Sequence, residues 1–163
     1  MRLLNFFKKD PNMLVKMVVL YVSSELNSIL IAPQYVDESW IRYEQEDIEQ
    51  LDFDCTDESL GEAIKRNFDK FAVKNMPNTK RTTKDWPAYQ ASKLKTETEF
   101  EHHYFKISIN GANDANIIMV FEADMKSKHD INVTSSVSAH AENHKLGRLV
   151  KQLHDIQINR TIE

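Results

Sequence analysis

The sequence predicts an α+β fold, in which a mixed or antiparallel sheet carries two main helices. Three observations lead to this prediction. Apolar or alternating runs are joined by short turns, which implies antiparallel pairing of neighbouring strands. In each half of the chain these runs are followed by one segment with helical, amphipathic spacing. The two helical segments share a six-residue phrase, which is compatible with a weak internal duplication.

The repeated phrase is LGEAIK at residues 60–65 and LGRLVK at residues 146–151. Gly61 and Gly147 occupy the same place in it, and the whole chain has only three glycines. A glycine inside a helix costs about 1 kcal/mol relative to alanine. We therefore expect each helix to need its backbone close to the sheet or to its partner helix. The alternative is that the match between the two six-residue phrases arose by chance.

The first half is predicted to hold several strands and then one helix. Residues 16–22 are rich in β-branched and aromatic residues, as in a buried strand. A second strand over 29–32 is expected to end at Pro33, 40–43 suit a short third strand, and 48–53 alternate weakly. The first helix is expected from Asp57 to about Val73, with Thr56 as its N-cap. Its apolar face would consist of Leu60, Ala63, Ile64, Phe68 and Phe71.

The second half begins with a long polar connection, residues 75–92, in which Trp86-Pro87 is the expected anchor. Residues 105–109 alternate as in a half-buried strand, and a turn is expected from Asn110-Gly111 to Asn116. The continuous apolar run 117–121 predicts a central strand buried on both faces. Residues 131–137 alternate again, and a helix over about 141–156 presents an apolar face. That face would consist of Leu146, Leu149, Val150 and Leu153.

Length and composition predict one soluble domain over residues 1–163. The apolar share is 41% and the charged share 28%, which suits a globular chain. Cys55 is the only cysteine, so no intrachain disulfide forms and a reducing compartment is expected. The N-terminal apolar run is too short for a signal peptide, and 13–22 is too short for a membrane span. We expect a cytoplasmic protein with no membrane partner.

The formal net charge of −4 conceals a strong asymmetry. Residues 37–62 contain eleven acidic residues opposed only by Arg42, whereas 64–95 contain nine basic residues against two acidic ones. Such an acidic patch repels nucleic acid and attracts a basic protein. The alternative is that the two segments are solvated faces that partly neutralise each other. The candidate binding residues of the patch are Asp37, Glu38, Glu44, Glu46, Asp47, Glu49, Asp52 and Asp54.

Motifs for catalysis are weak. Three scattered glycines cannot build a phosphate-binding loop, and Cys55 alone cannot supply a thiolate zinc site, so it is expected to be a small core residue. His140 and His144 are four apart, but Glu142 is misplaced for the zincin pattern and His140 is expected to lie before the helix. His102 and His103 would point to opposite faces of a strand.

One nuclease-like constellation has to be weighed. Asp114 precedes the apolar run 117–121, and Asp124 and Lys126 follow it. An acid followed by acid-x-Lys is a common arrangement for holding Mg²⁺ and activating water. Ten residues of strand span about 33 Å, so these acids would be too far apart unless the chain bends. A metal-dependent nuclease therefore remains an alternative function, as does a small self-associating scaffold.

The repeated phrase and the acidic stretch 54–59 before its first copy resemble the CdiI immunity proteins of bacterial contact-dependent growth inhibition systems. The order of elements is also similar: a strand pair, a first helix, a connection around Trp86, strands and a terminal helix. The motif itself rests on Leu60, Gly61, Leu146 and Gly147. The second copy departs from it, because residues 141–145 are less acidic.

This resemblance implies a non-enzymatic inhibitor without cofactor or metal. Its partner would be the C-terminal toxin domain of a cognate effector, commonly a basic nuclease, and it would not bind nucleic acid directly. On our charge count, the acidic patch is the candidate substitute for nucleic-acid phosphate. An exposed sheet edge or the polar connection 75–92 are the other candidate contact surfaces.

Overall fold

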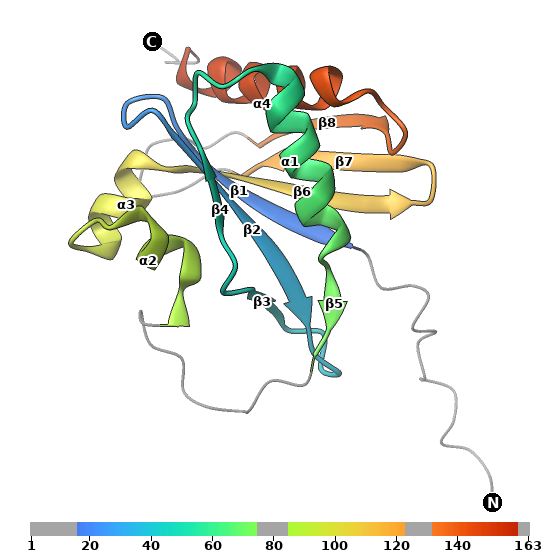
Figure 1. Ribbon diagram of the computed structural model, residues 1–163, viewed down its shortest axis with the longest axis horizontal. Coiled ribbons are helices and arrows are strands. Elements are labelled where there is room, and N and C mark those ends of the chain that lie inside the picture. Colours follow the sequence, from blue (N-terminus) through green and yellow to red (C-terminus); the bar gives the residue numbers. More distant parts are fainter. Residues whose placement is uncertain (1–15, 75–84, 123–131, 160–163) are drawn as a thin grey trace, which may run out of the picture.

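The sheet and its helices follow the predicted α+β plan. The computed structural model describes residues 16–74, 85–122 and 132–159, and in these stretches eight strands form one open sheet that carries four helices (Figure 1). The elements are β1 (Met17–Ser23), β2 (Ser28–Val36), β3 (Arg42–Glu44), β4 (Glu49–Leu51), α1 (Asp57–Asp69), β5 (Ala72–Val73), α2 (Pro87–Ser92), α3 (Glu97–His103), β6 (Phe105–Asn113), β7 (Asn116–Phe121), β8 (Val133–Ser138) and α4 (Asn143–Ile158).

The sheet order is β3-β2-β1-β6-β7-β8, with β4 and β5 also paired to β2. Every pairing is antiparallel except that of β2 with β5. The expectation that 117–121 is the strand buried on both faces is wrong. β7 lies next to the edge strand β8 and only alternate side chains of it are buried, whereas β1 is buried along almost its whole length.

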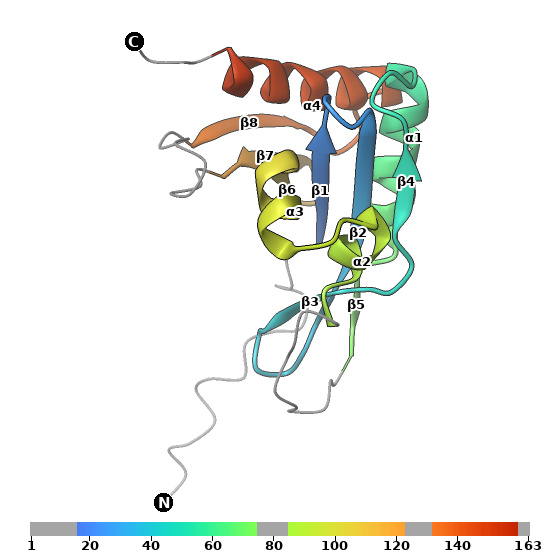
Figure 2. The same ribbon diagram turned by 90° about the vertical axis from the view of Figure 1, so that its left-hand side faces the viewer.

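Two hydrophobic cores lie on opposite faces of the sheet. α1 and α4 pack on one face, where Leu60, Ile64 and Leu146 meet alternate residues of the strands. The shorter α2 and α3 cover β1 and β2 on the other face, where Phe100 and Ala88 are buried. Figure 2 shows α4 and α1 above and beside the sheet and α2 and α3 on its other side. β1 is fully covered because its successive side chains enter one core and then the other.

Pro33 does not end the second strand. β2 continues to Val36, and its ladder with β1 includes the pair Val18 and Pro33. On its other edge β2 pairs with β4 through residues 29–31 and with β3 through 34–36, so Pro33 lies opposite the break between those two strands. At this break no ladder bond requires the N–H that proline lacks, which makes proline tolerable inside a strand.

The first helix is shorter than expected, and the turn between β6 and β7 has fewer residues than expected. α1 begins after the predicted cap Thr56, whose side-chain oxygen accepts from the Ser59 N–H, but it ends at Asp69. The expected last turn instead forms β5, because Ala72 and Val73 pair with the end of β2. β6 runs through Asn110-Gly111 to Asn113, so the turn is confined to Asp114 and Ala115.

The connection 75–92 is partly outside the described residues. Within its described part, Pro87 begins α2, and Trp86 packs in the second core as the expected anchor. α3 was not predicted, and its capping box consists of Thr96 and Glu99. His102 and His103 lie at the end of this helix rather than on a strand, and His103 pairs with Glu25.

The repeated glycines mark the crossing of α1 and α4. A Cβ atom on Gly61 would overlap the backbone of Asn143, and one on Gly147 would overlap the backbone of Asp57. Each glycine therefore lies against the residue four positions before the other glycine. Side chains larger than hydrogen would force the two helices apart, so the expectation of a close backbone approach is confirmed.

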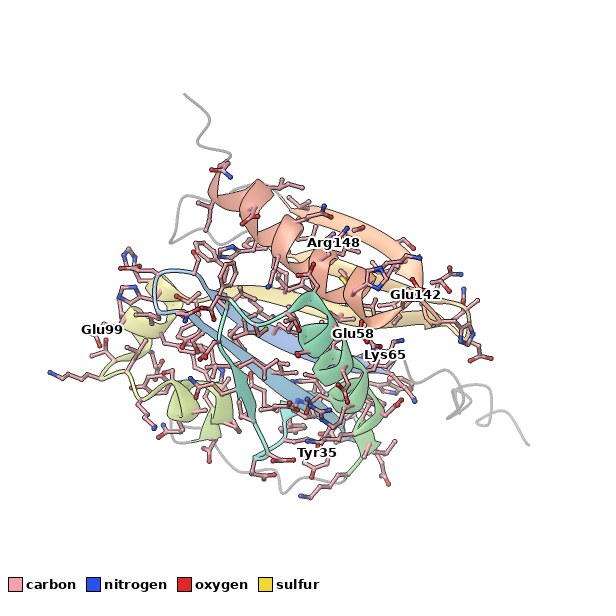
Figure 3. The ribbon with its side chains drawn as sticks, turned by 45° about the horizontal axis from the view of Figure 1, so that its top comes forward. Tyr35, Glu58, Lys65, Glu99, Glu142 and Arg148 are labelled. Atoms are coloured by element: carbon pink, nitrogen blue, oxygen red, sulfur yellow. The ribbon has the colours of Figure 1, made fainter. Side chains whose placement is uncertain are left out.

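Lysines of the same phrase complete a local two-fold arrangement. Lys65 Nζ donates to the carbonyl oxygen of Ala141 at 2.6 Å, and Lys151 Nζ donates to that of Cys55. Each lysine thus binds the carbonyl six positions before the other glycine, just ahead of the partner helix. Figure 3 shows Lys65 on α1 and Arg148 on α4 close to this crossing. The repeat in the sequence is a repeat of contacts between the two helices.

Candidate functional site

The acidic segment follows one edge of the sheet. It begins in the turn between β2 and β3, continues through β3 and β4, and ends in the first turns of α1. Figure 1 shows β4 beside β2 on the side away from β1. The eight candidate acids do not share one role along this edge, because some hold the fold together and others project from it.

Asp37 organises the turn between β2 and β3. Its Oδ1 accepts the backbone N–H groups of Ser39 at 2.8 Å and Ile41 at 2.9 Å. Its Oδ2 accepts the hydroxyl of Tyr43 at 2.7 Å. Glu38 is the next residue and is exposed. Asp37 therefore has a structural role at the start of the acidic segment, and Glu38 adds charge outside it.

Glu44 is half-buried, and its carboxylate binds Tyr21 and Trp86 of the second core. Its carboxylate accepts from the Tyr21 hydroxyl at 2.6 Å, from Trp86 Nε1 at 3.2 Å and from the Ala88 N–H at 2.9 Å. Burial raises the pKa of Glu44, although these hydrogen bonds oppose the shift. Burial and the Glu44 charge also raise the pKa of Tyr21 far above its ordinary value. The group joins β1, β3 and the start of α2.

Asp47 and Glu49 are paired with basic residues of α1 and its end. Lys70 Nζ lies 2.7 Å from Asp47 Oδ2, and Asn67 Nδ2 donates to Glu49 Oε2 at 2.6 Å. Arg66 makes two hydrogen bonds to the Glu49 carboxylate. Burial alone would raise the pKa of Glu49, but the bonds from Arg66 and Asn67 outweigh it and lower that pKa. Here the acidic and basic segments do neutralise each other.

The remaining acids project from the sheet edge. Glu46, Asp52 and Asp54 are exposed, and Asp54 also exchanges hydrogen bonds with Asn27 in the turn between β1 and β2. Arg66, Lys70, Arg148 and Lys151, which lie outside the segment, pair with some of its acids and offset part of its negative charge. We name Glu46, Asp47, Glu49, Asp52 and Asp54 the acidic edge.

The acids at the start of α1 connect to the last helix. Glu58 accepts from Asn143 Nδ2 at 2.8 Å and from the His144 N–H at 3.1 Å, and so it caps α4 from the neighbouring helix. Glu142, the residue at the N-cap position of α4, makes no capping bond with its own side chain. Asp57 pairs with Arg148 at 3.3 Å. These acids stabilise the helix crossing, a role that the sequence did not reveal.

Cys55 is half-buried against the first core, just before α1, as expected. Burial raises the pKa of its thiol. The thiol therefore carries less negative charge at neutral pH than a solvated cysteine would.

Where the structure describes them, the residues of the catalytic alternatives lie in a turn and around the start of α4. Asp114 is exposed in the turn between β6 and β7, while Asp124 and Lys126 lie outside the described residues. His140 precedes α4, as expected, and His144 lies in its first turn. Among residues 16–74, 85–122 and 132–159, no three histidine, cysteine or carboxylate side chains gather closely enough to hold a metal ion.

The sheet edge and the polar connection are the other two candidate surfaces for partner binding. β8 pairs with β7 and forms one end of the sheet in the described part of the chain. Residues 75–84 of the polar connection lie outside the described residues. Within the described stretches, no helix has both the length and the apolar character needed to cross a membrane.

Two solved structures share this fold. One is a protein of unknown function from Neisseria meningitidis, with a TM-score of 0.64 and 10% identity, over 87% of this chain and 94% of that chain. The other is a chain of the CdiA-CT/CdiI toxin and immunity complex from Yersinia pseudotuberculosis, with a TM-score of 0.58 and 11% identity. That match covers 86% of this chain and 96% of the other. No family model matches the sequence, and no curated protein matches it.

Proposed function

We propose that this protein is an immunity protein, which binds the C-terminal toxin domain of a cognate contact-dependent growth inhibition effector and neutralises it in the cytoplasm. The observation that carries the proposal is the fold match to a chain of a toxin and immunity complex, over 96% of that chain. The sequence resemblance to CdiI proteins supports the immunity role rather than the toxin role. In this role the protein needs no reaction of its own, only a surface complementary to the toxin.

Electrostatics supports a basic partner, such as a nuclease. The acidic edge presents carboxylates along β4 and the loops on both sides of it. A nuclease that binds phosphate carries a positive site, and a negative surface accelerates its encounter with an inhibitor. Carboxylates placed over that site would occupy it in place of the nucleic-acid backbone. Asp47 and Glu49 reach a partner with their charge reduced by Lys70 and Arg66, so Glu46, Asp52 and Asp54 would contribute most.

The direct test is co-expression with the C-terminal domain of any large secreted protein that is encoded next to this one. We expect a stable 1:1 complex on gel filtration and restored growth of cells that produce the toxin domain. No complex at low salt, or growth arrest that this protein leaves unchanged, would contradict the immunity function. Cleavage of RNA and DNA by the toxin domain, with and without this protein, would test its nuclease activity.

Charge reversal tests the acidic edge separately. Glu46→Lys and Asp52→Lys change exposed acids and leave the Lys70 and Arg66 pairs intact. We expect slower association with the toxin domain and a weaker salt dependence of the rate, because long-range attraction is reduced. Asp114→Lys makes the same charge change at the distant turn between β6 and β7 and serves as the matched control. Equal rates for all three variants would exclude the acidic edge as the binding surface.

A further inference from the structure

The strand β8 is an unprotected edge of the sheet. In the part of the chain that the structure describes, it pairs with β7 on one side and with no strand on the other. Natural proteins protect such edges with charged residues, proline or very short strands. The strands β3 and β4, at the opposite end of the sheet, follow this rule, because each has three residues and at least one charged side chain. β8 has six residues, and residues 132–139 include no charge and no proline.

Two residues of β8 direct their backbone polar groups away from the sheet. The Ala139 N–H donates to the Ala115 carbonyl at 2.8 Å, so the odd-numbered residues of this ladder exchange hydrogen bonds with β7. The N–H and carbonyl groups of the alternate residues Thr134 and Ser136 therefore point to the outer edge. A further strand placed along this edge would bind them.

The sequence of β8 is symmetric about Ser135. Thr134 and Ser136 flank it, and Val133 and Val137 follow on either side. When two copies of β8 pair antiparallel across a two-fold axis at Ser135, each threonine lies opposite a serine and each valine opposite a valine. Both are favourable cross-strand pairs, and no like charges meet. Both valines pack against the first core, so they lie on the same face of the joined sheet.

The side of α4 above this edge is apolar. α4 packs over β7 and β8, whereas α1 packs over β1 and β2 (Figures 1 and 2). Gly147 is the contact of α4 with α1, and the helical period places Leu149 and Ile156 on the opposite side of α4. They therefore face away from α1, toward the outer edge. Leu149 is half-buried, and Ile156 is 40% exposed.

Pairing through β8 would bring the two α4 helices side by side. Neighbouring strands are about 4.8 Å apart. Helices that each cover β7 and β8 would therefore be separated by two strand spacings, roughly 10 Å, a distance at which helices pack. A stable interface buries more than about 1,000 Å², and the apolar sides of the two helices add their area to that of the strands.

We propose that this protein forms a homodimer through β8, in which two sheets join into one continuous sheet and the two α4 helices pack against each other. The partner is a second copy of this chain, because the symmetry of β8 matches the strand to itself. The acidic edge lies at the other end of each sheet. A dimer therefore leaves it accessible, and each copy can bind one toxin domain.

The test is sedimentation of the full chain at micromolar concentrations. We expect a species with twice the mass of the 19.0 kDa chain, which dissociates on dilution. Ser136→Pro removes an N–H from the outer edge and leaves the ladder with β7 intact, and proline is tolerated at such a position. We expect this variant to keep its thermal stability and to sediment as a monomer.

Ile156→Lys tests the helix contact and decides alone if Ser136→Pro does not fold. It places like charges opposite each other, so we expect the dissociation constant of the dimer to rise about tenfold or more. Ile158→Lys is the matched control, because Ile158 is also 40% exposed on α4 but lies on the side toward α1. It should leave the dissociation constant unchanged.

The outcomes separate the dimer from the proposed function. A wild-type protein that stays monomeric overturns the inference. So does a dimer that folded Ser136→Pro leaves intact, or one that Ile156→Lys weakens no more than Ile158→Lys does. A monomeric wild type whose binding to the toxin domain is lost in Ser136→Pro would assign the edge to the toxin, which also overturns the dimer and leaves the immunity function standing. Dimerisation without toxin binding would support the inference and contradict the proposed function alone.

Discussion

The two helix pairs cover opposite faces of the same sheet by different means. α1 and α4 approach until their backbones touch, with Gly61 and Gly147 at the contact and lysines binding the partner's carbonyls. α2 and α3 are held by aromatic side chains around Phe100, and α2 also by the half-buried carboxylate of Glu44. Substitutions that add atoms at the crossing should therefore destabilise the pair α1 and α4. Substitutions that remove side-chain atoms should destabilise the pair α2 and α3. This difference can be measured.

The largest expected effect comes from Gly61→Ala. In an ordinary helix this change stabilises by about 1 kcal/mol. Here the new methyl group overlaps the backbone of Asn143, and we expect the free energy of unfolding to fall by about 4 kcal/mol. Gly111→Ala is the control, because its Cβ would meet the ring edge of Phe68 at 3.2 Å and Lys16 at 3.8 Å, with no backbone overlap. Urea denaturation of the two variants gives the answer.

The double variant sharpens this prediction. Once Gly61→Ala has forced α1 and α4 apart, adding Gly147→Ala should lower the free energy of unfolding only a little further, because both glycines permit the same close approach. A double variant whose loss equals the sum of the single losses would mean that the two contacts are independent. The two-fold description of the crossing would then be wrong.

Phe100→Ala tests the pair α2 and α3, and it should lower the free energy of unfolding by about 3 kcal/mol. Phe100 is buried and its ring lies 4.9 to 5.8 Å from those of Tyr21, Trp86, Tyr89 and Tyr104. Its removal leaves a cavity in a core that α2 and α3 close only with side chains. Amide hydrogen exchange should show faster opening of α2 and α3 than of α1. Uniformly faster exchange in both pairs would contradict the separation into two units.

Glu58→Ala should cost about 1 kcal/mol by uncapping α4. The carboxylate supplies the capping bond that Glu142, at the N-cap of α4, does not make. Glu99→Ala is the matched change in the second pair, because Glu99 completes the capping box of α3 within its own helix. We expect Glu58→Ala to weaken the contact between α1 and α4, and Glu99→Ala to affect α3 alone. Hydrogen exchange at residues 143–146 distinguishes the two results.

The smallest effect is a pH dependence of the first pair. His154 on α4 is buried between Phe53 and Phe105, neither ring nitrogen has a hydrogen-bond partner, and Asp155 Oδ1 lies 3.6 Å from Nδ1. Burial lowers the pKa of His154, although Asp155 opposes the shift. As the pH falls, His154 is therefore protonated in the unfolded chain before it is protonated in the folded protein, and the free energy of unfolding decreases below about pH 6.5. Over the first half pH unit this decrease stays below about 0.7 kcal/mol. His154→Leu should flatten the profile, and an unchanged slope would exclude His154 as its source.

The sequence predicted those features that depend on residues close together in the chain, such as helix caps and the glycine repeat. Thr56 caps α1 as expected, and the glycine repeat did indicate a close backbone approach. α2 and α3 have only six and seven residues, too few for an apolar period to stand out, and packing of Phe100 on the sheet stabilises them. The burial of Glu44 depends on Trp86, 42 residues further along the chain. No local pattern distinguishes such an acid from its exposed neighbours.

The helix crossing also dictates an order of events during synthesis. α1 is complete long before α4 leaves the ribosome, because the contacting phrases are 86 residues apart. Until then Leu60, Ile64 and the strand residues beneath them have no helix to close the first core. A nascent chain in this state exposes apolar surface and is open to aggregation and proteolysis. Chains that stop before residue 143 should therefore be removed by cellular proteases, and only completed chains should accumulate.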